Sequence, residues 1–331
     1  MNLSELREEI FKINSRERFN ELSLEVFKYQ ALNNSVYSEY ISLLGIDVNS
    51  VNSLDEIPFL PVRFFKNREI ISGSSEVETI FTSSSTTGMV PAKHYVTDLS
   101  LYRESFTKGF KQFYGEPSSY IFLALLPSYL ERKGSSLVYM AQELINLSAR
   151  EESGFYLYNH EELFELLNRL KESGKRVVLL GVSFALLDFV ASYSINFPNL
   201  IVIETGGMKG RGEELTRDLL HGRISKGFGI EQVHSEYGMA ELLSQAYSKE
   251  NGVFNSPNWM RVVIRDLYNP FKYYLNYNDS PLGGVNIIDL ANINSCSFIE
   301  TEDMGYSFSN GSFTIEGRIK DSELRGCNML L

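Results

Sequence analysis

The sequence predicts an α/β fold in which helices cover mixed sheets, joined to a C-terminal antiparallel sheet or small barrel. Between residues 76 and 236, short apolar runs alternate with helix-like segments, which is typical of a sheet that is parallel at least in part. After residue 255, strand-like runs follow one another directly. With 331 residues, 43% of them hydrophobic, the chain can bury one large core or two modest ones.

The N-terminal part is expected to be helical, because apolar residues recur at helical spacing through residues 3–31. Residues 57–66, IPFLPVRFFK, contain two prolines and are expected to form an extended connector. In the α/β part, residues 160–173 predict a helix that Asn159 caps and that stops at Gly174. The strand-like runs around it are VETIFTS, SYIFLALLP, GFYLY, RVVLLG, NLIVIETG and EQVHSEYG.

The C-terminal strands are expected at MRVVIRDL, GGVNIIDL, SCSFIETEDMG and GYSFSNGSFTIEG. In the last run Asn310-Gly311 predicts a hairpin with a two-residue turn. No repeat or linker divides the chain, so residues 1–331 are expected to form one domain. It would contain a helical region at 1–75, an α/β part at 76–250 and a mainly β part at 251–331.

Composition excludes several classes of protein. The formal net charge of −11 argues against a basic nucleic-acid-binding surface. Two cysteines make a disulfide framework improbable and suit a reducing compartment. The charged N-terminus carries no signal-peptide pattern, and no apolar run is long enough to span a membrane. We therefore expect a cytoplasmic protein that binds neither nucleic acid nor membranes.

The segment 80–94, IFTSSSTTGMVPAKH, offers hydroxyl and backbone groups after a strand, followed by Lys93. Such a turn is either a plain surface loop or a cradle for phosphate groups. It lacks the Gly-Lys-Ser/Thr of a Walker A loop. The residues that would form the cradle are Ser83, Ser84, Ser85, Thr86, Thr87 and Gly88.

Two further motifs follow predicted strands. In ETGGMKGR, Gly206 and Gly207 would permit a planar ligand to approach the backbone; the alternative is an ordinary β–α turn. In HSEYGMAE, Tyr237 and Gly238 end a strand, and Glu241 offers a hard oxygen ligand for Mg²⁺. The alternative there is a core tyrosine and a glutamate at a helix start.

The last candidates lie near the C-terminus. Asp303, expected in a turn between strands, could accept both hydroxyls of a ribose, and Arg318 is near enough in sequence to meet the same ligand. Both residue types are also ordinary at a protein surface. Cys327 is flanked by Arg325, and a nearby arginine favours the nucleophilic thiolate, although a single terminal cysteine is more often inert.

The order of these motifs resembles the adenylate-forming superfamily of acyl-CoA synthetases, adenylation domains and luciferases. More narrowly, PFLPVRFFK, LLPSYLERKGSSLVYM, ETGGMKGR, HSEYGMAELLSQAYS and RGCNMLL resemble the LuxE-type acyl-protein synthetases over residues 20–331. The resemblance implies a ligase that uses ATP and Mg²⁺ to convert a carboxylic acid into an acyl adenylate, and a fatty acid is the leading candidate for this acid. It would then transfer the acyl group to a cysteine and on to a partner such as a reductase subunit or acyl carrier protein.

The resemblance also implies a role for each motif. Ser83 to Gly88 and Lys93 would hold the ATP phosphates, Gly206 and Gly207 would border adenine, and Tyr237 beside Gly238 would stack on it. Glu241 would bind Mg²⁺, Asp303 the ribose hydroxyls, and Arg318 the ribose or α-phosphate. Cys327 would be the acylated cysteine. The side chains proposed for the acid pocket are Phe184, Leu187 and Met208.

Three departures from the superfamily pattern keep two alternatives open. Ser85 stands where a glycine is usual, Ala240 replaces a threonine, and the sequence stops where larger enzymes continue into a lid domain with a catalytic lysine. The first alternative is a ligase that acylates coenzyme A or a carrier protein directly, with Cys327 structural. The second is a non-catalytic nucleotide-binding subunit of a multienzyme complex.

Overall fold

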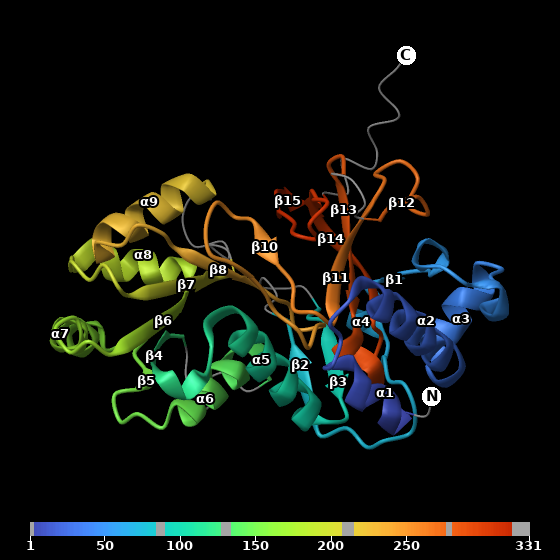
Figure 1. Cartoon of the computed structure of the whole chain (residues 1–331), viewed down its shortest axis with the longest axis horizontal. Coiled ribbons are helices and arrows are strands. Elements are labelled where there is room, and N and C mark those ends of the chain that lie inside the picture. Colours follow the sequence, from blue (N-terminus) through green and yellow to red (C-terminus); the bar gives the residue numbers. More distant parts are fainter. Residues whose placement is uncertain (1–2, 84–89, 127–133, 207–214, 276–279, 320–331) are drawn as a thin grey trace, which may run out of the picture.

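The computed structural model describes residues 3–83, 90–126, 134–206, 215–275 and 280–319. Within them, two sheets lie side by side, and a two-stranded hairpin lies near their junction (Figure 1). This arrangement confirms the predicted α/β fold with mixed sheets and a C-terminal, largely antiparallel sheet.

The first sheet has seven strands in the order β10-β9-β8-β7-β6-β4-β5. The strands from β8 to β5 are parallel, whereas β9 and β10 are antiparallel, so the expectation of a partly parallel sheet is confirmed. Strands β4 and β6 are almost wholly buried because helices cover both faces. The bounds are β4 Tyr120–Leu125, β5 Gly154–Phe155, β6 Arg176–Val182, β7 Ile201–Thr205, β8 His234–Tyr237, β9 Ala246–Ser248 and β10 Phe254–Asn255.

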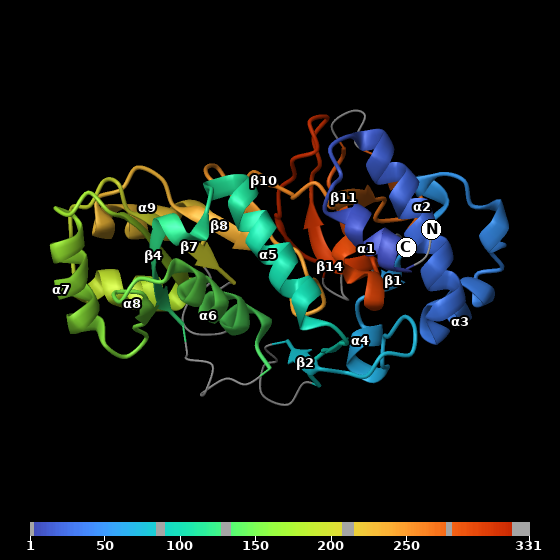
Figure 2. The same cartoon turned by 60° about the horizontal axis from the view of Figure 1, so that its bottom comes forward.

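Helices α5 and α6 cover one face of this sheet, and α8 and α9 cover the other (Figure 1). Helix α5 also reaches the second sheet, where the indole N–H of Trp259 donates to Ser105 Oγ at 3.1 Å (Figure 2). Asn159 does not cap α7 through its side chain, which instead donates to Glu162. The bounds are α5 Leu99–Tyr114, α6 Ser136–Ser148, α7 His160–Leu170, α8 Ser183–Ser192 and α9 Arg217–Phe228.

The second sheet has the order β1-β14-β13-β11-β12, with β15 paired to β14. All neighbours are antiparallel except β1 and β14. The segment 57–66, predicted as a connector, supplies β1 and the start of α4, a four-residue helix. The bounds are β1 Leu60–Pro61, α4 Phe64–Asn67, β11 Met260–Arg265, β12 Tyr273–Tyr274, β13 Gly283–Asp289, β14 Phe298–Gly305 and β15 Gly317–Arg318.

The predicted N-terminal helices pack against this second sheet (Figure 1). Gln30 of α2 donates through its amide to the carbonyls of Asn292 and Ile293, each at 3.0 Å. The helices are α1 Leu3–Ile10, α2 Arg16–Asn33 and α3 Ser35–Leu43. Short 3₁₀ turns follow at η1 Val48–Ser50, η2 Leu54–Glu56, η3 Pro117–Ser119 and η4 Leu290–Asn294.

The predicted C-terminal hairpin is present, but its turn has three residues rather than two. The N–H of Gly311 donates to Phe308 O, and the N–H of Phe308 donates to Ser312 O, both at 2.8 Å. These bonds enclose residues 309–311. Gly311 has φ +87°, which is the position for a left-handed glycine after a type I turn.

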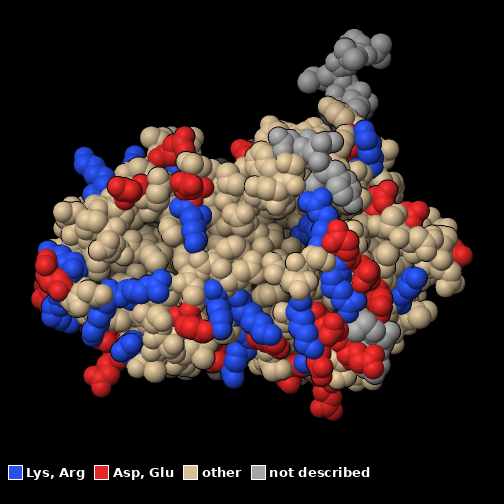
Figure 3. Space-filling model, in the orientation of Figure 1, with Lys and Arg blue, Asp and Glu red and all other residues tan. Residues whose placement is uncertain are grey.

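Acidic and basic side chains are interspersed on the face shown in Figure 3, and no broad basic surface is visible there. No helix in the described ranges is long and apolar enough to cross a membrane.

Candidate active site

The predicted phosphate loop connects β2 (Thr79–Thr82) to β3 (Lys93–Val96), which pair as an antiparallel hairpin. Thr82 faces Lys93 across the strands, and the N–H of Thr82 donates to Gly134 O at 2.7 Å, which ties the hairpin to the start of α6. The hydroxyl of Ser83 accepts from the N–H of Ala92 at 2.9 Å. The structure thus places the base of the loop, with Lys93 exposed. Ser84, Ser85, Thr86, Thr87 and Gly88 lie outside the described residues.

Tyr237, Asp303 and Arg318 come together where the two sheets meet. The hydroxyl of Tyr237, at the end of β8, donates to Asp303 Oδ2 at 2.7 Å. Arg318 Nε donates to Asp303 Oδ1 at 3.3 Å, because Asp303 and Arg318 are cross-strand neighbours on β14 and β15. Asp303 was expected in a turn but lies within a strand, and this register is what fixes the pair.

The electrostatics of this trio keep Tyr237 protonated. Loss of solvent first, and then the negative charge of Asp303, raise the pKa of Tyr237 well above its ordinary value. The phenol is therefore a permanent donor to Asp303. The carboxylate of Asp303 retains lone pairs for further donors such as ribose hydroxyls, since a carboxylate can accept about four hydrogen bonds.

Glu241 lies in a turn after β8, not in the first turn of a helix. Two side chains from other elements hold this turn by its carbonyl groups. His94 Nδ1 lies 2.9 Å from Ala240 O, and Asn292 Nδ2 donates to Glu241 O at 2.8 Å. Asp289 also accepts from the N–H groups of Leu243 and Ser244 at 3.0 and 2.9 Å. These bonds hold the turn in a non-helical conformation, and the chain then enters β9.

Burial raises the pKa of the Glu241 carboxyl, while the positive charges of Arg318 and Lys66 oppose that rise. Glu241 is therefore a buried carboxylate with cations nearby and suits Mg²⁺ as a single oxygen ligand. The described ranges contain no group of three or more His, Cys, Asp or Glu able to hold a metal ion. Most ligands of a magnesium ion here would be waters and phosphate oxygens, as is usual for nucleotide-bound Mg²⁺.

The glycine turn after β7 is only partly described. Gly206 has φ +60°, a conformation that favours glycine. An ordinary β–α turn therefore already accounts for a glycine at this position. The hydroxyl of Ser183, at the start of α8, lies 2.9 Å from Glu204 Oε2 and 3.1 Å from Gly206 O. Gly207 and Met208 lie outside the described residues. Phe184 and Leu187 are partly buried on α8 and pack against the core.

Sequence reasoning missed several buried or half-buried polar residues at the same edge of the sheet. Glu204 Oε1 lies 3.6 Å from His221 Nε2. Burial raises the pKa of Glu204, but hydrogen bonds from His221, Ser235 and Ser183 outweigh this effect and hold the pKa below its usual value. Glu236 is buried beside Tyr237 and accepts from Thr205. The available signal was a carboxylate near the end of each apolar strand, in VIETGG and VHSEYG.

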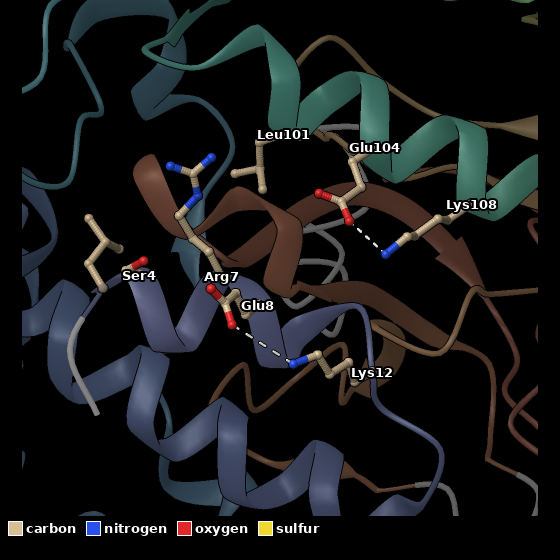
Figure 4. A pocket seen from close by; sticks show the side chains of 8 residues that line it. Ser4, Arg7, Glu8, Lys12, Leu101, Glu104 and Lys108 are labelled. Carbon is tan, nitrogen blue, oxygen red and sulfur yellow. Dashed lines mark ion pairs between the residues drawn. The ribbon is translucent and has the colours of Figure 1, made fainter.

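One cavity lies away from these residues. It has a volume of about 730 Å³ and lies between α1 and α5 (Figure 4). Glu8 pairs with Lys12 across its wall, and Glu104 pairs with Lys108 at 2.6 Å. It contains none of the predicted site residues, so we do not assign the chemistry to it.

The comparisons identify a family and a fold. A sequence family described as acyl-protein synthetase, LuxE, matches residues 7–331. No curated protein matches the chain. Among solved structures, ATP-bound MatB from Rhodopseudomonas palustris is similar with 16% identity and a TM-score of 0.54, covering 76% of this chain and 50% of that one.

A second similar structure is a long-chain-fatty-acid–CoA ligase from Archaeoglobus fulgidus, with 13% identity and a TM-score of 0.51. The match covers 77% of this chain and 54% of that ligase. The chain thus spans about half the length of these structural neighbours. At such low identity the likeness establishes the shared fold alone.

Proposed function

The chain belongs to the LuxE family of acyl-protein synthetases and is a ligase by that membership, and from this premise we propose that it activates a carboxylic acid with ATP and transfers the acyl group to Cys327. The observation that supports the proposal most is the meeting of Tyr237, Asp303 and Arg318 between the two sheets. Tyr237 thereby meets an Asp303–Arg318 pair that begins 66 residues farther along the sequence.

In the proposed nucleotide complex, Asp303 accepts the ribose hydroxyls and Tyr237 stacks on adenine. Arg318 pairs with the ribose or the α-phosphate, and its side chain is 75% exposed, so it can turn from Asp303 toward an anion. The phosphates lie against the β2–β3 hairpin near Lys93. ATP is also the ligand in the similar MatB structure, which agrees with this assignment.

In the first step, a carboxylate oxygen of the acid forms a bond to the α-phosphorus, and the bond from that phosphorus to pyrophosphate breaks. Two anions must meet, so positive groups at the site lower the barrier. Arg318 and Lys93 are the described cations assigned to this role. Mg²⁺, held through Glu241, would neutralise charge on the phosphates when bound.

In the second step, the Cys327 thiolate forms a bond to the acyl carbonyl carbon, the bond to AMP breaks, and the thiol proton has already passed to solvent or a base. Cys327 lies outside the described residues. The last described residue before Cys327 is Ile319, whose N–H donates to Glu302 O at 2.7 Å beside Asp303. Cys327 follows Ile319 by eight residues, and a fully extended chain of that length spans up to roughly 28 Å, which is enough to reach an acyl adenylate at this site.

The other cysteine is unsuited to this step. Cys296 is fully buried, and burial raises the pKa of its thiol to about 12. At neutral pH it is therefore a thiol without access to substrate. The final acceptor is proposed to be a partner protein, such as a reductase subunit or an acyl carrier protein.

The test combines pyrophosphate exchange with acyl labelling. The protein should exchange labelled pyrophosphate into ATP only when its acid is present, and it should retain labelled acyl groups. Cys327→Ser should abolish the retained label and keep exchange, whereas the matched control Cys296→Ala should keep both. Label that persists in Cys327→Ser contradicts the cysteine step.

The same assay separates the alternatives. Thioester formation on coenzyme A or a carrier protein that survives Cys327→Ala would identify a direct ligase. ATP binding without exchange for any acid, also with partner proteins present, would identify a nucleotide-binding subunit.

A further inference from the structure

Two buried polar side chains lie together next to the candidate site without a part in the steps above. Glu236 and Gln245 are 8% and 5% exposed. The position where a Cβ of Gly238 would lie is 2.5 Å from Glu236 Oε1 and 3.4 Å from Gln245 Cγ. The two side chains therefore flank the same glycine, and the lack of a side chain at Gly238 leaves them the space.

These side chains belong to the face of the seven-stranded sheet that α5 and α6 cover. Residues alternate between faces along a strand, so Glu236 points away from the face of Ser235 and Tyr237. Burial first, and then the negative charge of Glu236, raise the pKa of Tyr102, a buried residue of α5. Tyr102 in turn contacts Phe81 of the β2–β3 hairpin, with ring centroids 5.2 Å apart. Tyr102 thus connects the surroundings of Glu236 to the hairpin that carries the predicted phosphate loop.

The hydrogen bonding of this pair is incomplete. Thr205 donates to Glu236 Oε2. The hydroxyl of Tyr102 donates its proton to Ser136 O at 3.0 Å, and the amide of Gln245 lies near enough to this phenol to oppose the rise of its pKa. Among the described residues nothing donates to Gln245 Oε1. A buried acceptor without a donor costs free energy, and a ligand that supplies a donor recovers it.

We propose that Glu236 and Gln245 select an acid that carries a hydroxyl group on the carbon next to its carboxylate or one carbon farther. The hydroxyl donates to Gln245 Oε1 and shares a hydrogen bond with Glu236 Oε1. The inference rests on the proposed function, since it concerns the acid whose carboxylate meets the α-phosphate at the ends of these strands. It places the acid on the face that α5 and α6 cover, whereas Phe184 and Leu187, the side chains expected from the sequence to line the acid pocket, lie on α8 at the other face. It replaces an unsubstituted fatty acid by a hydroxy acid as the preferred substrate.

The state of Glu236 favours a hydroxyl over an ammonium group. Burial first, and then the charge of Glu204, raise the pKa of Glu236 to about 7, so near neutrality a large share of it is uncharged. An uncharged carboxyl both donates and accepts, as a hydroxyl does. An ammonium group only donates and pairs best with an ionised carboxylate.

The experiment measures pyrophosphate exchange and binding with matched acids. The pairs are butanoate with α- and β-hydroxybutanoate, and decanoate with β-hydroxydecanoate; β-aminobutanoate distinguishes the ammonium source. The full chain should prefer the hydroxy acid in a pair by roughly tenfold or more in kcat/KM. Glu236→Gln and Gln245→Leu should each reduce this preference toward one.

Matched substitutions at other positions provide the controls. Glu161→Gln at an exposed position of α7 and Gln142→Leu at a half-buried position of α6 should keep the preference. Calorimetry of the same acids with a non-hydrolysable ATP analogue reads binding without turnover. If Gln245→Leu does not fold, Gln245→Glu provides a second variant, which should lower affinity for the hydroxy acid.

Each outcome decides one question. Exchange with equal rates for both acids of every pair overturns the inference and leaves the proposed function intact. A preference for β-aminobutanoate over β-hydroxybutanoate also overturns it, because the selected group is then an ammonium. Absence of exchange with every acid counts against the proposed function, and calorimetry then decides the inference: tighter binding of the hydroxy acid supports it and equal binding refutes it.

Discussion

Glu236 shows how one buried carboxyl links the stability of the protein to pH. Its pKa is raised by burial to about 7, against 4.5 for an exposed glutamate. Below pH 4.5 the carboxyl is protonated in both the folded and the unfolded chain. Between pH 4.5 and 7 the unfolded chain releases this proton and the folded chain keeps it, so the free energy of unfolding falls as pH rises.

We expect Glu236→Gln to remove this dependence. The variant should gain stability relative to the parent between pH 4.5 and 7, by about 3 kcal/mol at the upper end. Urea unfolding of both proteins from pH 4.5 to 8 measures the difference. Glu161→Gln, on the exposed surface of α7, is the control and should follow the parent throughout. A difference that does not change with pH would contradict the assignment.

The parent has to be compared with Glu236→Gln because two histidines change the free energy of unfolding with pH in the opposite direction. Burial lowers the pKa of His94 and of His234 to about 4. Both bind fewer protons when folded than unfolded, so their contribution to stability is lost as pH falls from 6.5 toward 4. The parent curve alone therefore mixes two opposite slopes.

At the level of single residues, the sequence indicated Tyr237, Asp303 and Arg318, and the structure brings these three together. It did not indicate Glu236 or Gln245, because their significance depends on burial and on neighbours from α5. A carboxylate at the end of an apolar strand is visible in a sequence. Whether it is exposed, paired or protonated depends on elements that a sequence does not place.

At the level of elements, side chains from three other elements hold the turn after β8 in place. Strand β3 provides His94, η4 provides Asn292, and the end of β13 provides Asp289. The sequence pattern suggested a helix start at Glu241. Long-range bonds from Asp289 to the N–H groups of Leu243 and Ser244 outweigh that local preference, which is how tertiary contacts commonly override propensity.

His94 should therefore act as a positioning residue for Glu241. The ring is buried and neutral, so Nδ1–H donates to Ala240 O and fixes the carbonyl that precedes Glu241. His94→Phe removes this donor and should raise the Mg²⁺ concentration for half-maximal exchange by about 10- to 100-fold. His94→Asn, whose amide can place a donor near the same point, should recover part of the loss.

The control is His160→Phe, which changes a histidine of α7 whose ring contacts Phe189 and whose Nε2 has no partner among the described residues. It should leave the Mg²⁺ dependence unchanged. The melting temperature is recorded for each variant. If His94→Phe lowers only the melting temperature and not the apparent Mg²⁺ affinity, the residue serves the fold and not the site.

At the level of the whole molecule, the sequence predicted the two kinds of sheet because strand and helix patterns are local. It could not predict that β1 pairs with β14, since these strands are two and eight residues long and are separated by more than 200 residues. That pairing, with the packing of α1 to α3, joins both ends of the chain in one sheet. The meeting of the two sheets at Tyr237 and Asp303 was accessible only through the resemblance of the motifs to a known family.

A nucleotide bound as proposed touches both sheets, Tyr237 on β8 and Asp303 with Arg318 on β14 and β15, so it should stabilise the molecule as a whole. ATP at a hundred times its Kd should raise the free energy of unfolding by about 2.7 kcal/mol. Hydrogen exchange should slow in β8 and in β14 together. Asp303→Asn should remove most of both effects, because an amide pairs poorly with Arg318 and accepts less from ribose, whereas the exposed Asp218→Asn on α9 should retain them. Protection confined to one of the two strands would show that the nucleotide does not bridge the sheets and would refute the site as assembled.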